Sequence, residues 1–283
     1  MAKQILRTLL VFFLILFPFL TGNLVAKFTP YKEGNSMTSY VLILTLVTLA
    51  IGLILFLIIR RYGQSFNTPV SGGVPLFLIG TVIMGITGLA APPDLSIVML
   101  QHPEREHFRY IVLFIAALLF GFYAAIQFGN NTFQLTNPLK WIMAVLFVLA
   151  FAEMIWEFSH HYLYPEGLKK WTDEGKNADD FVKSYDNIHV IIPGATGRLI
   201  QFSIVMWLAI RLYQLRKVKI WSPVLTCLMG LMGIISAAVI LVTEMHLPKG
   251  FEFLFLFFIP GIPFILLYWT GVALLTREKL PHN

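Results

Sequence analysis

Cysteine and charge are both scarce in this sequence of 283 residues. Cys227 is its single cysteine, so the chain cannot form an intramolecular disulfide, a cysteine-based zinc site or a cysteine-ligated iron–sulfur cluster. Charged residues make up 13% of the chain and hydrophobic residues 57%, whereas a soluble domain carries about 25% and about 45–50%. The composition therefore predicts an integral membrane protein whose surroundings are membrane lipids.

The net charge of +6 does not mark a nucleic-acid-binding surface. Proteins that bind nucleic acid gather Lys and Arg on one face, and here these residues are scattered between apolar runs. We therefore predict no nucleic-acid partner.

Apolar runs of near-spanning length dominate the chain, since about 20 residues of helix cross a hydrocarbon core of ~30 Å. The runs are continuous rather than alternating, which favours helices over the strands of a barrel. We predict an all-α polytopic transmembrane helical bundle of about eight spans, forming a single domain over residues 1–283. The predicted spans cover residues 8–26, 40–59, 73–91, 110–128, 141–158, 199–210, 221–242 and 253–275. The sixth is short unless it extends back through residues 193–198.

Lys and Arg in short juxtamembrane segments predict the orientation of the bundle. Their density is higher on the face that holds both termini, so we predict cytoplasmic termini. The first span also resembles a signal peptide, and cleavage after Ala26 is the alternative. An uncleaved helix is favoured because Leu24 would occupy a position where a small residue is expected.

Acids and histidines gather at the opposite, extracytoplasmic face. Of the 15 acids all but Glu278 fall there, as do all of the seven histidines except His282. The polar connection at residues 159–197 is predicted to form a small extracytoplasmic cap between spans five and six. Within it, Asn177 and Asp180 have the spacing of a capping pair that opens a short helix.

The fifth span carries the most unusual polar residues. Glu153, Glu157, His160 and His161 share one helical face. Glu153 lies 13 residues beyond Lys140, ~20 Å along a helix and thus inside the hydrocarbon zone, where an ionised carboxylate costs ~2.5 kcal/mol or more. It should therefore be protonated, paired or metal-bound.

The sixth span offers a partner for these carboxylates. Arg198 is predicted at a comparable depth, with Gln201 one turn further along on nearly the same face. If spans five and six pack together, Arg198 would form an ion pair with Glu153 or Glu157. We take Glu153, Glu157 and Arg198 as the candidate catalytic residues.

Imidazole and carboxylate groups also predict a candidate metal site. Such groups are the usual ligands of Zn, Fe or Mn. A metal site that combines ligands from spans five and seven requires these two spans to be neighbours. Further ionisable residues at helix ends are Asp94, His107, Arg109, His189 and Glu252. The candidate ligands are Glu157, His160, His161, Glu244 and His246.

Glycine and proline mark further positions within the spans. Ile-Pro-Gly occurs at residues 192–194 and 259–261, which indicates either paired interruptions of transporter helices or an ordinary loop turn and an ordinary proline kink. The glycines of the third span and those of residues 228–238 in the seventh have the spacing of small-residue packing faces.

Three functions remain open from the sequence. The first is a metal-dependent membrane enzyme acting on a lipid or other amphiphilic substrate, with Arg198 as counter-charge for an anionic head group. The second is a transporter or proton-coupled carrier that uses Glu153 and Arg198. The third is a non-catalytic membrane subunit or sensor.

Overall fold

A computed structural model of the chain describes residues 2–62, 80 and 97–275. These residues form helices and connections, and no strand occurs among them. Six of their helices are long and apolar enough to cross a membrane, and a bent helix pair near the end of the chain adds a seventh candidate. Apart from Gly80, the predicted span at residues 73–91 lies outside the described residues.

The long helices in chain order are α1 (Ala2–Ala26), α2 (Met37–Tyr62), α4 (Pro103–Gly129), α5 (Asn137–Tyr162), α8 (Ile188–Gln214), α9 (Trp221–Thr243) and α11 (Gly261–Leu275). The shorter elements are η1 (Ile97–Gln101), α6 (Tyr164–Asp173), η2 (Ala178–Asp180), α7 (Phe181–Tyr185), η3 (Glu252–Leu254) and α10 (Phe255–Phe258).

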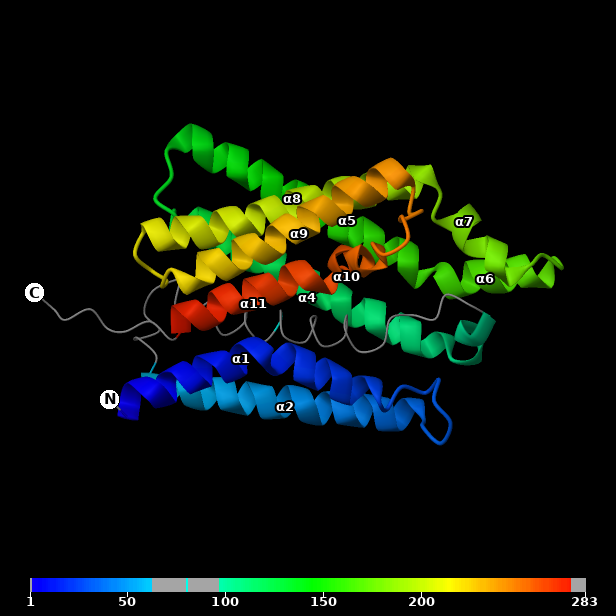
Figure 1. Cartoon of the computed structure of the whole chain (residues 1–283), viewed down its shortest axis with the longest axis horizontal. Coiled ribbons are helices and arrows are strands. Elements are labelled where there is room, and N and C mark those ends of the chain that lie inside the picture. Colours follow the sequence, from blue (N-terminus) through cyan, green and yellow to red (C-terminus); the bar gives the residue numbers. More distant parts are fainter. Residues whose placement is uncertain (1, 63–79, 81–96, 276–283) are drawn as a thin grey trace, which may run out of the picture.

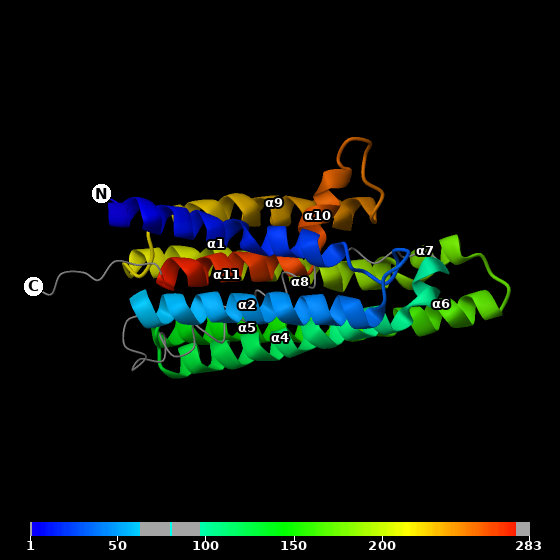
Figure 2. The ribbon, with the colours of Figure 1, turned by 90° about the horizontal axis from the view of Figure 1, so that it is seen from below.

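The long helices run side by side as an elongated bundle (Figure 1). The beginning of α1 and the end of α11 lie at one end of it, and α6 and α7 at the other, in both Figure 1 and Figure 2. Along α2, exposed leucines recur every three or four residues, which gives this helix an apolar outer face suited to lipid. These leucines are Leu42, Leu46, Leu49 and Leu53.

The segment between α5 and α8 is shorter and more helical than the predicted cap. Residues 159–162 complete α5, and α8 begins at Ile188, so the connection folds into α6, η2 and α7. Asn177 opens η2 as predicted, because its side chain accepts a hydrogen bond of 3.1 Å from the backbone N–H of Asp179.

The sixth predicted span reaches full length in α8. This helix extends back through Pro193, which lies inside it and not in a loop turn.

The last predicted span is broken. Its two parts, Glu252–Phe258 and Gly261–Leu274, are bent by 61° at the Ile259-Pro260 step. Pro260 lacks the N–H that would continue the helix, which accounts for the break. We call residues 252–258 the arm.

Proline also shapes α1, where it frees a carbonyl group. Pro18 cannot donate to the carbonyl of Leu14 four residues earlier. The hydroxyl of Tyr268 on α11 donates to this carbonyl at 2.8 Å, and the indole of Trp269 donates to Ile15 O at 3.0 Å. These bonds fix α1 on α11 and satisfy backbone groups that lipid could not.

Glycines bring α9 close to α8, as the small-residue pattern of the seventh span predicts. Gly230 lies against Met206 and Gly233 against the ring of Phe202, so closely that an added methyl group would overlap either side chain. Together with α5, which packs on the other side of α8, this contact determines the depth at which polar groups of α5 and α8 meet.

Candidate functional site

An ion pair joins the two helices at the centre of the candidate site. Arg198 Nη2 on α8 lies 2.5 Å from Glu157 Oε1 and 2.6 Å from Oε2 on α5. Arg198 is 1% exposed and Glu157 6%, so the pair is almost completely removed from solvent. The ion pair predicted from the sequence is therefore present, and it satisfies two charges that would be costly alone in an apolar bundle.

Gln201 extends this pair to a second carboxyl group. Its Oε1 accepts a hydrogen bond of 2.8 Å from Arg198 Nη1, and its Nε2 donates to Glu153 Oε2. Arg198 Nη1 also lies 3.8 Å from Glu153 Oε2. Within the described residues, the buried Oε1 of Glu153 has no hydrogen-bond partner. One guanidinium group thus faces two carboxyl groups.

Gly197 makes room for Glu153. A methyl group on Gly197 would overlap the Glu153 carboxyl group and the adjoining Cγ atom. Glu153 therefore lies directly on the backbone of α8. It is one turn of α5 before Glu157, which places it beside Gln201. This is a close approach that only glycine permits.

The break before α11 supplies the remaining contact of Arg198. Its Nε donates to the backbone carbonyl of Phe258 at 2.9 Å, and its guanidinium lies 5.6 Å from the Phe258 ring centre. Pro260 and the bend leave carbonyl groups without helical donors, and Arg198 satisfies one of them. Four hydrogen bonds, to Glu157, Gln201 and Phe258, hold the guanidinium in place.

Aromatic contacts continue the site from α5 toward α4. His161 Nε2 lies 4.0 Å from Glu157 Oε1, and its ring stacks on Tyr110 with 5.6 Å between centres. Next to Tyr110, Arg109 Nη1 is 3.4 Å from Glu106 Oε2, while Arg105 pairs with the other oxygen of Glu106.

Arg105, Glu106 and Arg109 are each at most 2% exposed. Sequence reasoning placed Arg109 at a helix end and missed the other two, although Glu-Arg-Glu-His at residues 104–107, directly before a long apolar run, was an available signal. The burial of charge on α4 depends on its neighbours, among them Tyr40 of α2, whose ring centre lies 5.5 Å from the Arg105 guanidinium.

Two histidines of the long helices contact the segment between α5 and α8, which contains α6 and α7. His160 Nε2 lies 3.0 Å from Asp186 Oδ1, and the Tyr185 hydroxyl donates to the backbone carbonyl of His160 at 2.8 Å. On α4, His107 Nε2 lies 2.8 Å from Glu166 Oε1 of α6. Burial and the nearby carboxylates of Asp186 and Glu166 raise the pKa of Tyr185 to about 12, so its hydroxyl remains a donor at neutral pH.

The candidate metal ligands lie in two separate places. Glu157, His160 and His161 follow one another on α5, but His160 faces Asp186 and Glu157 faces Arg198. Glu244 and His246 are exposed beyond the end of α9, which packs on α8. Among the described residues, no group of three or more His, Cys, Asp or Glu side chains could hold a metal ion.

The other ionisable residues predicted at the extracytoplasmic face lie apart from one another. His189 is exposed at the start of α8, and Glu252 is exposed on the arm, where its Oε2 accepts a hydrogen bond of 2.8 Å from Gly250 N. Asp94 lies outside the described residues.

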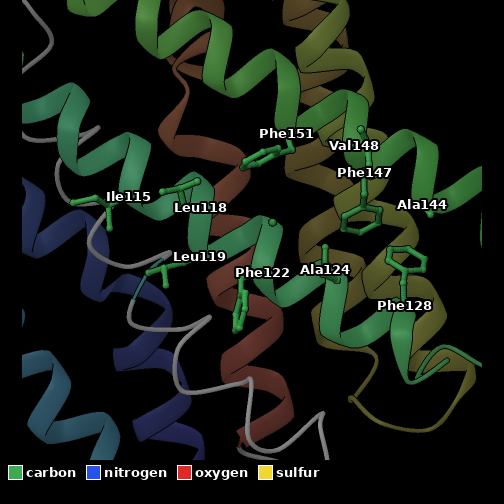
Figure 3. A pocket seen from close by; sticks show the side chains of 12 residues that line it. Ile115, Leu118, Leu119, Phe122, Ala124, Phe128, Ala144, Phe147, Val148 and Phe151 are labelled. Atoms are coloured by element: carbon green, nitrogen blue, oxygen red, sulfur yellow. The ribbon is translucent and has the colours of Figure 1, made fainter.

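A large apolar cavity lies apart from these polar groups. It has a volume of about 700 Å³ and is lined by residues of α4 and α5 (Figure 3). Its walls are apolar, with Phe122 and Phe128 contributed by α4 and Phe147 and Phe151 by α5. Its α5 lining ends at Phe151, before Glu153, so the cavity does not include the ion-paired groups.

Comparison of the chain with protein-family models, with curated proteins and with solved structures finds no match. The functional argument therefore starts from the geometry of this site.

Proposed function

We propose that this multi-pass membrane protein is a proton-coupled carrier, with Glu153, Glu157 and Arg198 as its coupling site. The observation that carries the proposal is the sharing of one buried guanidinium group by two carboxyl groups beside a broken helix. Ionisable groups inside a membrane domain are costly and commonly serve ion or proton movement.

Charge balance assigns different roles to the two acids. Glu157 holds both oxygens against Arg198 and forms the permanent ion pair. A negative charge on Glu153 would have no counter-ion of its own, because Arg198 Nη1 is 3.8 Å away and already bonded to Gln201. We therefore assign Glu153 as the group that binds and releases the proton.

The helix break supports a carrier over the other two functions. Discontinuous helices beside intramembrane charges are typical of transporter binding sites, where freed backbone groups face the site. A role for Arg198 in holding a lipid head group would require spare donors, and four of its five N–H groups are bonded to Glu157, Gln201 and Phe258. Metal-assisted catalysis remains a prediction from the sequence.

Infrared spectroscopy of the purified protein in lipid tests the proton-binding site. We expect a protonated carboxyl band in the wild type that disappears reversibly as the pH is raised and is missing from Glu153→Gln. Glu174→Gln is the matched control, because Glu174 is solvated and its pKa is lowered by a hydrogen bond from Lys176. A wild-type spectrum without a Glu153-dependent band would contradict the proposal.

Proteoliposomes with a trapped pH-sensitive dye test coupling. Candidate solutes are added outside, and a carried solute should change the internal pH in the wild type. The change should be lost in Glu153→Gln and retained in Glu174→Gln. Equal responses of wild type and Glu153→Gln to a carried solute would contradict the assigned role of Glu153.

We also propose an orientation in which the α6 and α7 end faces the extracytoplasmic side. The support is the density of Lys and Arg in the short segments at the opposite end. In this orientation the coupling site lies closer to the extracytoplasmic side. We propose separately that the α1 span remains uncleaved, because Leu24 does not suit a cleavage site.

A further inference from the structure

The arm at residues 252–258 packs on α9, and much of its own surface stays exposed. Leu254 is its one buried side chain, while Phe251 before it, Phe253 and Leu256 are exposed. In Figure 2 the arm, drawn in orange, crosses the direction of the long helices. A short segment with one fully buried side chain opens at a lower free-energy cost than the core of a bundle.

Two side chains hold the arm in this position through its backbone. Ser236 of α9 donates to Leu254 O at 2.8 Å, and Arg198 of α8 donates to Phe258 O at 2.9 Å. Behind the second bond, Pro260 and Gly261 separate the arm from α11, where the chain bends by 61°. The arm therefore has two hydrogen-bonded attachments, and a bend at Pro260 separates it from α11.

The arm also covers the coupling site. The Phe258 ring lies over the Arg198 guanidinium, and a methyl group on Gly194, one turn earlier in α8, would meet this ring at 3.9 Å. Arg198 belongs at once to the carboxyl pair and to the arm, so a change in its bonding to Glu157 alters its bond to Phe258 as well.

We propose that the arm is the gate of the carrier: it swings about Ile259-Pro260-Gly261 to open the Glu153, Glu157 and Arg198 site, and Arg198 and Ser236 hold it closed. This inference rests on the proposed carrier function, because it identifies the element that admits solute to that site. The gate requires the covered surface of α8 to become accessible when the arm opens.

Thiol labelling measures this accessibility without a transport assay. In a Cys227→Ser background, Gly194→Cys places a thiol beneath Phe258 with ordinary contact to the ring. A membrane-impermeant thiol reagent should modify it slowly in lipid nanodiscs. Adding Ser236→Ala removes one attachment, and we expect the labelling rate to rise roughly three- to tenfold, the factor for one lost hydrogen bond.

Two matched positions separate gate opening from general loosening. His189→Cys, on the exposed first turn of α8, should react equally fast with and without Ser236→Ala. Ala150→Cys, 1% exposed in the core, should stay unreactive in both. Hydrogen exchange supplies a second measurement: amides of residues 252–258 should exchange faster than those of α11, and faster still in Ser236→Ala.

Two results would overturn the gate. Labelling of Gly194→Cys as fast as that of His189→Cys would mean that the arm does not cover this surface. Equal labelling of Gly194→Cys with and without Ser236→Ala, together with unchanged exchange of the arm, would mean that these bonds do not hold a gate. Either result leaves the infrared test of Glu153 unaffected, so failure of the gate is distinguishable from failure of the carrier proposal.

Discussion

Glu153 and Glu157 lie one turn apart on α5, yet their surroundings differ. Glu157 is bonded through both oxygens to Arg198, whereas Glu153 bonds Gln201 through one oxygen. The sequence places both acids and Arg198 at similar depth, which was sufficient to predict an ion pair. It could not assign the partner, because a shift of α5 along α8 by about one helical turn, ~6 Å, would exchange the two acids.

This difference predicts unequal costs for two matched substitutions. Glu157→Gln leaves Arg198 buried without its main counter-charge, so we expect a loss of about 3–5 kcal/mol of stability. Glu153→Gln retains the shape and an acceptor for Gln201, and we expect a loss of about 1 kcal/mol. Thermal unfolding of both variants in the same detergent measures the difference. Equal destabilisation would contradict the assigned pairing.

At the scale of single residues, the sequence also missed part of the buried charge. Arg105 and Glu106 precede the predicted fourth span and were not singled out, since helix ends commonly carry charge to the head groups. In the fold, α4 begins at Pro103 and these side chains are enclosed, with Tyr31 and Tyr40 around Arg105. Burial at a helix end depends on neighbouring elements, which a single segment does not reveal.

At the scale of elements, the contact of α8 with α9 makes a prediction about two glycines. Gly233→Ala should destabilise the protein by about 1–3 kcal/mol, because its methyl group would overlap Phe202, a core ring with no room to move. Gly230→Ala should cost less, because the side chain that it meets, Met206, is flexible and partly exposed.

Unfolding temperatures of the two glycine variants measure this difference. The two positions are three residues apart on the same helix, so each variant is the control for the other. A larger loss in Gly230→Ala would contradict the packing of α9 on α8.

Proline patterns predicted positions of interruption but not their form. Pro193 and Pro260 each lie in a copy of the tripeptide Ile-Pro-Gly. The sequence left open whether each copy forms a loop turn, a kink or a functional break. Pro193 is accommodated within α8, whereas the chain bends by 61° at Pro260. The difference is tertiary, because Arg198 and Ser236 stabilise the bent arm through its carbonyl groups.

At the scale of the whole molecule, the two ends of the bundle should face opposite sides of the membrane. In a Cys227→Ser background, a cysteine at the exposed Lys176 should react with an impermeant thiol reagent in intact cells. A cysteine at the exposed Asn130, beyond the far end of α4, should react only after the cells are permeabilised. Labelling of Asn130→Cys alone in intact cells would reverse the proposed orientation, and labelling of both would contradict a spanning bundle.

The sequence alone determined the helical class, the approximate positions of the membrane-length helices and the concentration of acids and histidines toward one end. These properties follow from composition and from periodicity along single segments, so they need no knowledge of neighbours. The tertiary structure decided which acid pairs with Arg198, the burial of charge on α4 and the attachment of the arm. Each of these depends on the rotation and approach of helices distant in sequence, which glycines such as Gly197 and Gly233 permit and side-chain packing determines.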